Sequence, residues 1–212
     1  MADGYLEKKF DAAFGPEARK VVVKRVSLDK LLEKNRSYRG YQKDYVMKRE
    51  MLERIVAVNT KLPSARNQQV LRFKLVTRDT GADKVLANIK LGGALPELHL
   101  PFPGMEPEAF IIVCSMVEEN KFVDIDLGIS VQSMLLKAVE MGLNGIVIGA
   151  FDKVSVKRDF ELKYEPLLIV AVGKGAETIQ MVAIGETENH AYYRKDGIHY
   201  VPKLTLEALL SC

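Results

Sequence analysis

The spacing of apolar residues along the chain predicts a mixture of helices and strands. Between residues 48 and 61 apolar residues recur every three to four positions, which predicts a helix that ends before Pro63. Residues 71–77 instead alternate apolar and basic side chains, a period of two that is typical of a half-buried strand. The same patterns predict helices at residues 28–34, 80–90, 124–141, 153–162 and 205–210, strands at 109–116 and 167–172, and short apolar runs at 143–151 and 179–184.

These elements predict an α+β fold in which helices cover a sheet. Four or five strands are mixed with helices, and there is no regular βαβ repeat. The helix at 124–141 has apolar residues on more than one face, so it must be buried on several sides. It therefore lies either at the centre of the domain or in a subunit interface, and the two positions are compatible.

Length and composition predict one globular domain preceded by a polar arm. The 212 residues are 48% hydrophobic and 28% charged, with no composition break that would separate two domains, so we expect a single domain at 27–212. Residues 1–26 are charged with few apolar points, and we expect an arm or helix that packs against the main body.

Charge, cysteine and histidine content argue against several classes of protein. A net charge of +3, scattered along the chain, is too small to indicate nucleic-acid binding. No signal peptide or membrane-length apolar run is evident, and Cys114 and Cys212 form no C-x-x-C pair. We therefore expect a cytoplasmic protein in a reducing compartment, with no membrane partner. The three histidines lack acidic or cysteine neighbours at ligand spacing, so no metal site is expected.

Two short polar segments carry the most specific chemistry. Residues 35–39, Asn-Arg-Ser-Tyr-Arg, follow the predicted helix at 28–34 and bring two guanidinium groups and a hydroxyl together, which suits a phosphate. Residues 63–69, Pro-Ser-Ala-Arg-Asn-Gln-Gln, fall in a loop, where hydroxyl and amide groups can bind the polar edge of a heterocycle. Together they indicate a phosphorylated, planar cofactor; the plainer alternatives are an exposed basic helix end and a capped polar turn.

From about residue 27 to the C-terminus the sequence resembles the FMN-dependent nitroreductase family. The family motif Arg-Arg-Ser-x-Arg is similar to residues 35–39, and the motif Pro-Ser-x-x-Asn-x-Gln-Pro-Trp is similar to residues 63–69. A buried helix followed by Gly-Leu-Gly and Ile-Gly is matched by residues 142–145 and 148–149. The resemblance implies a central, mostly antiparallel sheet of four to five strands flanked by helices, and a homodimer with flavin at the subunit interface.

The resemblance also implies roles for individual residues. The FMN phosphate would be held by Arg36, Ser37 and Arg39, and Arg39 would also reach the pyrimidine edge of the flavin. The backbone amide of Gly149 would donate to flavin N5, in a segment where glycine lets the backbone approach the ring. The other implied flavin contacts, those from the 63–69 segment commonly supplied by the partner subunit, are Pro63, Ser64, Ala65, Asn67, Gln69, Ile148 and Ala150.

The sequence departs from the family pattern in three places. Asn35 stands where the family has its first arginine, which removes one phosphate donor. Val70 and Leu71 replace the Pro-Trp pair and alter packing under the flavin. The tail of the family brings a further basic residue to the phosphate; Lys203 is the best match, with Arg194 as the second candidate.

The function implied by the resemblance is that of an FMN oxidoreductase. NAD(P)H would reduce the flavin, and a nitroaromatic, quinone or other electron-poor small molecule would take the electrons in a ping-pong cycle. Because the flavin carries the chemistry, no catalytic side chain is assigned. Pocket-lining candidates, each with a structural alternative, are His99, Phe102 and Tyr41. The sequence leaves open NADH or NADPH as donor and the identity of the acceptor.

Two other functions fit part of the sequence. A non-enzymatic FMN-binding protein, used for storage or sensing, would keep the flavin site and lack a productive substrate pocket. A phosphate-binding module unrelated to flavin would explain residues 36–39 and leave 64–69 and 148–149 unexplained.

Overall fold

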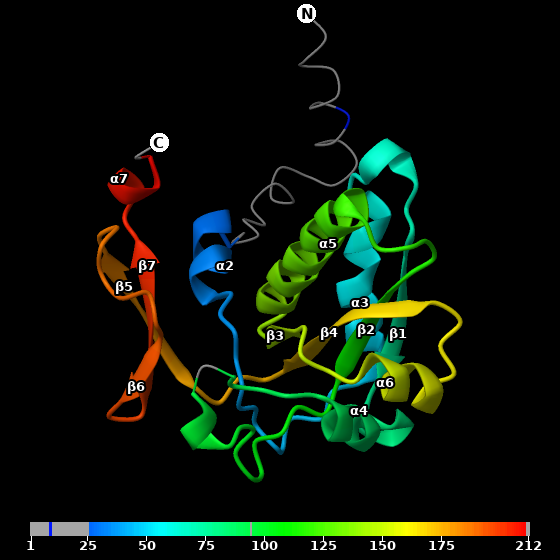
Figure 1. Ribbon diagram of the computed structural model, residues 1–212, viewed down its shortest axis with the longest axis horizontal. Helices are drawn as coiled ribbons and strands as arrows, with labels where there is room; N and C mark the ends of the chain where they lie inside the picture. The colour runs from blue at the N-terminus through cyan, green and yellow to red at the C-terminus, as the bar shows by residue number, and fades with distance from the viewer. Residues whose placement is uncertain (1–8, 10–25, 94, 211–212) are drawn as a thin grey trace, which may run out of the picture.

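The computed structural model describes residues 9, 26–93 and 95–210, which form two sheets with flanking helices (Figure 1). The helices are α2 (Leu28–Lys34), α3 (Arg49–Val56), α4 (Ala82–Asn88), α5 (Lys121–Glu140), α6 (Lys153–Asp159) and α7 (Leu206–Leu209). The strands are β1 (Leu71–Val76), β2 (Phe110–Ser115), β3 (Asn144–Ile148), β4 (Glu165–Gly173), β5 (Thr178–Ile184), β6 (Tyr193–Lys195) and β7 (Ile198–Leu204). The predicted arm at residues 1–26 lies outside the described residues except for Lys9 and Val26.

The central sheet has four strands in the order β1-β2-β4-β3, and every neighbouring pair is antiparallel. Phe110 of β2 pairs with Val76 of β1 on one side and with Ala171 of β4 on the other. The predicted α+β class and its antiparallel sheet are therefore confirmed. Strands β1 and β3 form the two edges, and this order decides where the polar segments lie.

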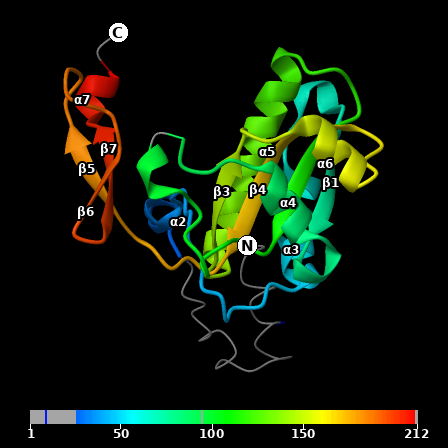
Figure 2. The same ribbon diagram turned by 60° about the horizontal axis from the view of Figure 1, so that its bottom comes forward.

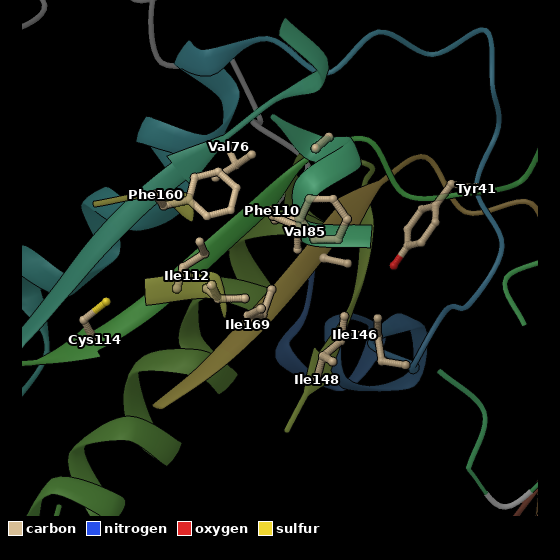
Figure 3. Close-up of a cluster of buried hydrophobic side chains, with 13 residues drawn as sticks. Tyr41, Val76, Val85, Phe110, Ile112, Cys114, Ile146, Ile148, Phe160 and Ile169 are labelled. Carbon is tan, nitrogen blue, oxygen red and sulfur yellow. The ribbon is translucent and has the colours of Figure 1, made fainter. Parts of the chain in front are cut away.

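Helices cover both faces of the central sheet, α3 and α5 on one face and α4 and α6 on the other (Figure 2). Successive side chains of a strand point to opposite faces. Ile111 and Val113 of β2 accordingly pack with residues of α3 and α5, whereas Phe110 and Ile112 pack on the other face with residues of α4 and α6 (Figure 3). Strand β2 is an uninterrupted apolar run because both of its faces are covered.

Helix α5 starts three residues earlier than the sequence predicts. The side chain of Asn120 caps it by accepting hydrogen bonds from two backbone N–H groups of the first turn, at 3.0 and 3.4 Å. Met134 and Leu135 are buried against the central sheet, but Phe122 and Ile125 are 54% and 48% exposed. The helix is therefore central to the core along most of its length and presents apolar side chains to the surface near its start.

Other helix boundaries follow local chemistry. Ser27 caps α2 and Asp152 caps α6, as predicted, because each side-chain oxygen accepts from a backbone N–H of the first turn. Helix α3 ends at Val56, and the chain continues to Lys61 as a 3-10 turn rather than as the single predicted helix. None of the described helices is both long and apolar enough to cross a membrane.

A second sheet, in the order β5-β7-β6, was not predicted beyond the apolar run at 179–184. Strands β6 and β7 form a hairpin around Asp196 and Gly197, whose φ values of 51° and 77° give the two-residue turn that Asp-Gly favours. Pro202 lies beyond the residues of β7 that pair with β6, so it removes no hydrogen bond on that side. We call this the C-terminal sheet; α2 lies between it and α5 (Figures 1 and 2).

Gly145 of β3 is a position at which a side chain cannot be accommodated. An added Cβ would lie 2.7 Å from the carbonyl oxygen of Ala171 and 2.7 Å from a methyl of Leu135. We expect Gly145→Ala to lower the free energy of unfolding by roughly 1–3 kcal/mol because the neighbouring strand would have to shift. The control is Gly128→Ala on α5, where an added Cβ meets nothing within 4 Å.

Urea unfolding of both variants tests this expectation. Gly128→Ala should leave stability unchanged or raise it by up to about 1 kcal/mol, because alanine favours a helix interior. Equal stabilities for the two variants would contradict the close approach of β3 to β4 at Gly145.

Candidate functional site

The 35–39 segment runs along the edge of β3, directly after α2. Ser37 pairs with Gly145 as a short parallel bridge, and the N–H of Tyr38 donates to the carbonyl of Gly145 at 3.1 Å. The Asn35 amide donates to Gln132 of α5 at 3.3 Å. The predicted place of this segment, at a helix end, is thus observed, and the segment is held between the central sheet and α5.

Arg36 and Arg39 both turn toward the C-terminal sheet. Arg36 donates to the carbonyl oxygen of Leu32 at 2.6 Å and to the sulfur of Met181 at 3.1 Å. The Arg39 residue is 8% exposed, and its guanidinium donates to the carbonyl of Ser37 at 3.0 Å. Neither guanidinium forms an ion pair with a carboxylate among the described residues.

The C-terminal sheet brings further polar side chains to Arg39. Nη1 of Arg39 lies 3.5 Å from Nε2 of His199, and the guanidinium lies 4.8 Å from the centroid of the Tyr192 ring. Glu177, between β4 and β5, accepts from the backbone N–H groups of Arg39 and Gly40 and pairs with Arg194 of β6. We call Arg36, Arg39, Glu177, Arg194 and His199 the basic cluster.

The basic cluster contains every buried side-chain nitrogen or oxygen that lacks a hydrogen-bond partner in the described part of the chain. The four atoms are Nε of Arg36, Nε of Arg39, Nε of Arg194 and Nδ1 of His199. Buried polar atoms are normally paired, so their concentration at one place calls for an explanation. Three guanidinium groups beside one carboxylate leave a surplus of positive charge, which suits an anionic ligand.

Sequence reasoning missed two members of the basic cluster. The spacing around His199 speaks only against a metal site, and Glu177 lies in a segment without a recognisable motif. The Asp-Gly turn at 196–197 is a signal that could have placed Arg194 opposite His199, since the two pair across the hairpin. No local signal identifies Glu177, because its role depends on contacts between distant segments.

The two tail candidates for the phosphate occupy different positions. Arg194 lies in the basic cluster, where its guanidinium also stands 5.5 Å from the centroid of the Phe102 ring. Lys203 is exposed on β7. Because alternate residues of a strand share a face, Lys203 is on the same face of the C-terminal sheet as His199, and so is Met181, which contacts Arg36. Both candidates thus remain predictions.

The 63–69 segment is a tight turn rather than an open loop. Ser64 accepts from the N–H of Gln69 at 3.1 Å, and the N–H of Ala65 donates to the buried carboxylate of Asp126 at 2.8 Å. Arg66, Asn67 and Gln69 have left-handed φ values of 52°, 54° and 50°. Asp126, which sequence reasoning did not single out, therefore anchors the segment to α5.

One chain does not bring the two polar segments together. The 63–69 segment leads into β1, whose Leu71 pairs with Ser115, whereas Ser37 pairs with β3 at the opposite edge of the sheet. Three strand spacings of about 4.8 Å separate these edges. Pro63, Ser64 and Gln69 instead line a cavity of about 670 Å³ between β1, α3 and α5.

The third predicted segment lies at the end of β3. Ile148 is 2% exposed, whereas Gly149 and Ala150 are exposed, and a Cβ added at Gly149 would meet nothing within 4 Å. The carbonyl of Ala150 accepts from the N–H of Lys90 at 2.9 Å. The space beside Gly149 is therefore open, on the same edge strand that holds the 35–39 segment.

The pocket-lining candidates separate in the structure. Tyr41 is a core residue, 3% exposed, and its hydroxyl donates to the carbonyl of Tyr38 at 2.9 Å. Phe102 lies beside Arg194, and His99 is exposed in the same proline-rich connection. No group of three or more potential metal ligands assembles among the described residues.

The charge of His199 should affect stability at acidic pH. Burial and the positive charges of Arg39 and Arg194 lower the pKa of His199 to about 4 from 6.5. A base with a lowered folded-state pKa binds protons more tightly when unfolded, so stability should fall as the pH drops from about 6.5 toward 4. This loss should be smaller in His199→Gln, by on the order of 2–3 kcal/mol.

Urea unfolding of both proteins across this pH range measures the difference, in which the titration of the carboxylates cancels. Parallel stability curves would show that His199 is not buried beside the two arginines.

Comparisons with known proteins agree with the observed fold. The profile of the nitroreductase family matches residues 32–174. A nitroreductase family protein from Clostridium difficile 630 is 23% identical over 72% of this chain and 86% of its own, with a TM-score of 0.56. A protein from Exiguobacterium sibiricum in complex with FMN is 17% identical over 72% and 90%, with a TM-score of 0.59. A protein from Staphylococcus epidermidis named as an NAD(P)H:FMN oxidoreductase is 21% identical over 73% and 90%, with a TM-score of 0.56.

Identities this low show a shared fold. A comparison of the sequence with curated proteins finds no significant match. The match to the family profile spans more than half of the 212 residues and includes the 35–39 and 63–69 segments, and on this basis the chain belongs to the nitroreductase family.

Proposed function

We propose that the protein is a homodimeric FMN oxidoreductase that uses NAD(P)H to reduce nitroaromatic, quinone or similar electron-poor small molecules. The observation that carries this proposal is the basic cluster, with its surplus of positive charge and unpartnered buried nitrogens. The neighbours crystallised with FMN or named as an NAD(P)H:FMN oxidoreductase support the choice of cofactor.

The residues present fit the phosphate of FMN. Glu177 neutralises Arg194, which leaves Arg36 and Arg39 without a carboxylate among the described residues. A phosphate monoester carries a charge of about −1.5 to −2 at pH 7, which two guanidinium groups balance. The Ser37 hydroxyl adds a neutral donor. The low exposure of Arg39, 8%, strengthens its charge-assisted contacts because little water competes for the donors.

The opposite placement of the two polar segments supports a site built from two chains. The 63–69 segment cannot reach the 35–39 segment of its own chain without crossing the central sheet. In a symmetric dimer each copy would supply its 63–69 segment to the other copy's flavin, so that two equivalent sites form. The exposed Phe122 and Ile125, on the first turns of α5 beside that segment, offer apolar surface for such an interface.

Bound FMN would supply hydride transfer at its N5 atom, first from NAD(P)H and then to the acceptor. This chain's residues would bind and orient it. The amides of Asn67 and Gln69 can donate and accept at the polar edge of the ring, and Gly149 leaves the approach to the ring unobstructed. No side chain is required as nucleophile or obligatory base.

Replacing Arg36 tests the phosphate site with little risk to folding, because among the described residues this side chain donates hydrogen bonds only to Leu32 and Met181. Arg36→Ala should weaken FMN binding by about 1.5–3 kcal/mol, the usual strength of a charged hydrogen bond. Riboflavin, which lacks the phosphate, should bind equally to both proteins. The matched control is Arg158→Ala on α6, which removes the same charge from an exposed side chain that belongs neither to the basic cluster nor to the cavity beside the 63–69 segment.

Flavin fluorescence titration gives all of these affinities. Unchanged FMN affinity in Arg36→Ala would show that the phosphate lies elsewhere.

The redox activity is tested by anaerobic reduction of the FMN-loaded protein. NADH or NADPH should bleach the flavin absorbance, and menadione or a nitrofuran should then restore it. Absence of bleaching with both nucleotides would contradict an NAD(P)H oxidoreductase and favour a protein that only binds FMN. A protein that takes up no FMN would contradict both.

A further inference from the structure

We propose that Glu177 is a positioning residue that fixes residues 35–40, hereafter the phosphate-binding segment, against the C-terminal sheet, an inference that rests on the proposed FMN site. Its carboxylate contacts neither Arg36 nor the guanidinium of Arg39. It acts on the backbone of the segment and on the counterion Arg194.

Glu177 is placed where the chain passes from β4 of the central sheet to β5 of the C-terminal sheet, and its side chain is only 4% exposed. One oxygen, Oε2, accepts from the N–H of Arg39 and from the N–H of Gly40, the latter at 2.9 Å. The other oxygen, Oε1, pairs with Nη2 of Arg194 on β6. A single carboxylate therefore joins the phosphate-binding segment to the hairpin of the C-terminal sheet.

The surrounding backbone reinforces this junction. The N–H of Ala176 donates to the carbonyl of Gly40 at 3.0 Å, and Tyr41 pairs with Gly175 as an antiparallel bridge. A Cβ added at Gly175 would lie 2.4 Å from ring atoms of Tyr38, so the two segments are in close contact. The carboxylate of Glu177 adds two hydrogen bonds to this pairing, which it accepts from the N–H groups of Arg39 and Gly40. It thereby fixes the backbone position from which the Arg39 side chain extends.

The distribution of charge indicates that Glu177 positions the phosphate-binding segment and does not compete with the phosphate for the guanidinium groups. A carboxylate that occupied the anion site would pair with the guanidinium groups that bind the anion. Glu177 instead neutralises Arg194, and among the described residues Arg36 and Arg39 keep no carboxylate partner. The cluster thus holds two uncompensated cations for one phosphate dianion. By this reasoning Arg194 is the counterion of Glu177 rather than a phosphate ligand.

Glu177→Gln makes the distinction measurable. The amide oxygen can accept either the backbone N–H groups or Arg194, and the NH₂ group then faces the other donor. The side chain at 177 then no longer joins the backbone of the phosphate-binding segment to Arg194, although the net positive charge of the basic cluster rises by one. Positioning predicts that FMN affinity falls by at least about tenfold, whereas competition by the carboxylate predicts that it rises.

The double variant Glu177→Gln with Arg194→Gln supplies the rescue. With an amide at both positions, the oxygen at 177 can accept the backbone N–H groups while its NH₂ group donates to the oxygen at 194. FMN affinity should then recover most of the loss seen in Glu177→Gln. If Arg194 were a phosphate ligand, the double variant would instead bind FMN more weakly than Glu177→Gln.

The experiment is a flavin fluorescence titration of the full chain and its variants with FMN and with riboflavin. The control is Glu188→Gln, which removes the same charge from an exposed side chain in the β5–β6 connection. The expected result is a loss of at least about tenfold for FMN in Glu177→Gln, little change for riboflavin, and recovery in the double variant. Equal losses for both flavins, or unchanged or tighter FMN binding, would overturn the inference.

Two further outcomes are distinguishable. Wild-type protein that fails to bind FMN would contradict the proposed function itself, whatever the variants do. If Glu177→Gln does not fold, the double variant decides: near wild-type FMN affinity supports positioning, and a loss of tenfold or more overturns it.

Discussion

The arrangement of the site depends on the burial of positive charge without matching negative charge. Removing a guanidinium from water is unfavourable unless a charged partner or a full set of acceptors replaces the water. Arg39 has a carbonyl, an imidazole and an aromatic ring around it, while Glu177 serves the third arginine, Arg194. An anion would complete this arrangement. Burial, together with the charges of Arg39 and Arg194, lowers the pKa of His199 to about 4.

The edge positions of β1 and β3 connect the fold to the proposed dimer. The 35–39 segment runs along β3, and the 63–69 segment precedes β1, so the antiparallel order of the central sheet separates them by its full width. A flavin that contacts both must lie between two copies of the chain. Asp126 anchors the 63–69 segment to α5, and α5 presents Phe122 and Ile125 close by, so the segment and the apolar surface would approach a partner together.

The central sheet and most helices could be predicted because their signals are local. Ser27 and Asp152 cap their helices from the expected positions, and the apolar run of β2 reflects burial on both faces. The predicted start of α5 is three residues too late, because the side chain of Asn120 caps the helix at Lys121. Glu177 has no such local signal. Its partner Arg39 is far from it in the sequence, and strand β5 separates it from its partner Arg194. Such contacts become visible only when the two sheets are placed together.

The central claim is that Arg36 and Arg39 hold a phosphate dianion. The most direct test is ³¹P NMR of FMN bound to the protein, followed from about pH 7.5 to about pH 5.5. Free phosphate monoesters gain a proton near pH 6. Two neighbouring guanidinium groups should lower that pKa, so the account predicts that the resonance of bound FMN stays at the dianion position throughout. A resonance that titrates near pH 6, as in free FMN, would contradict the account.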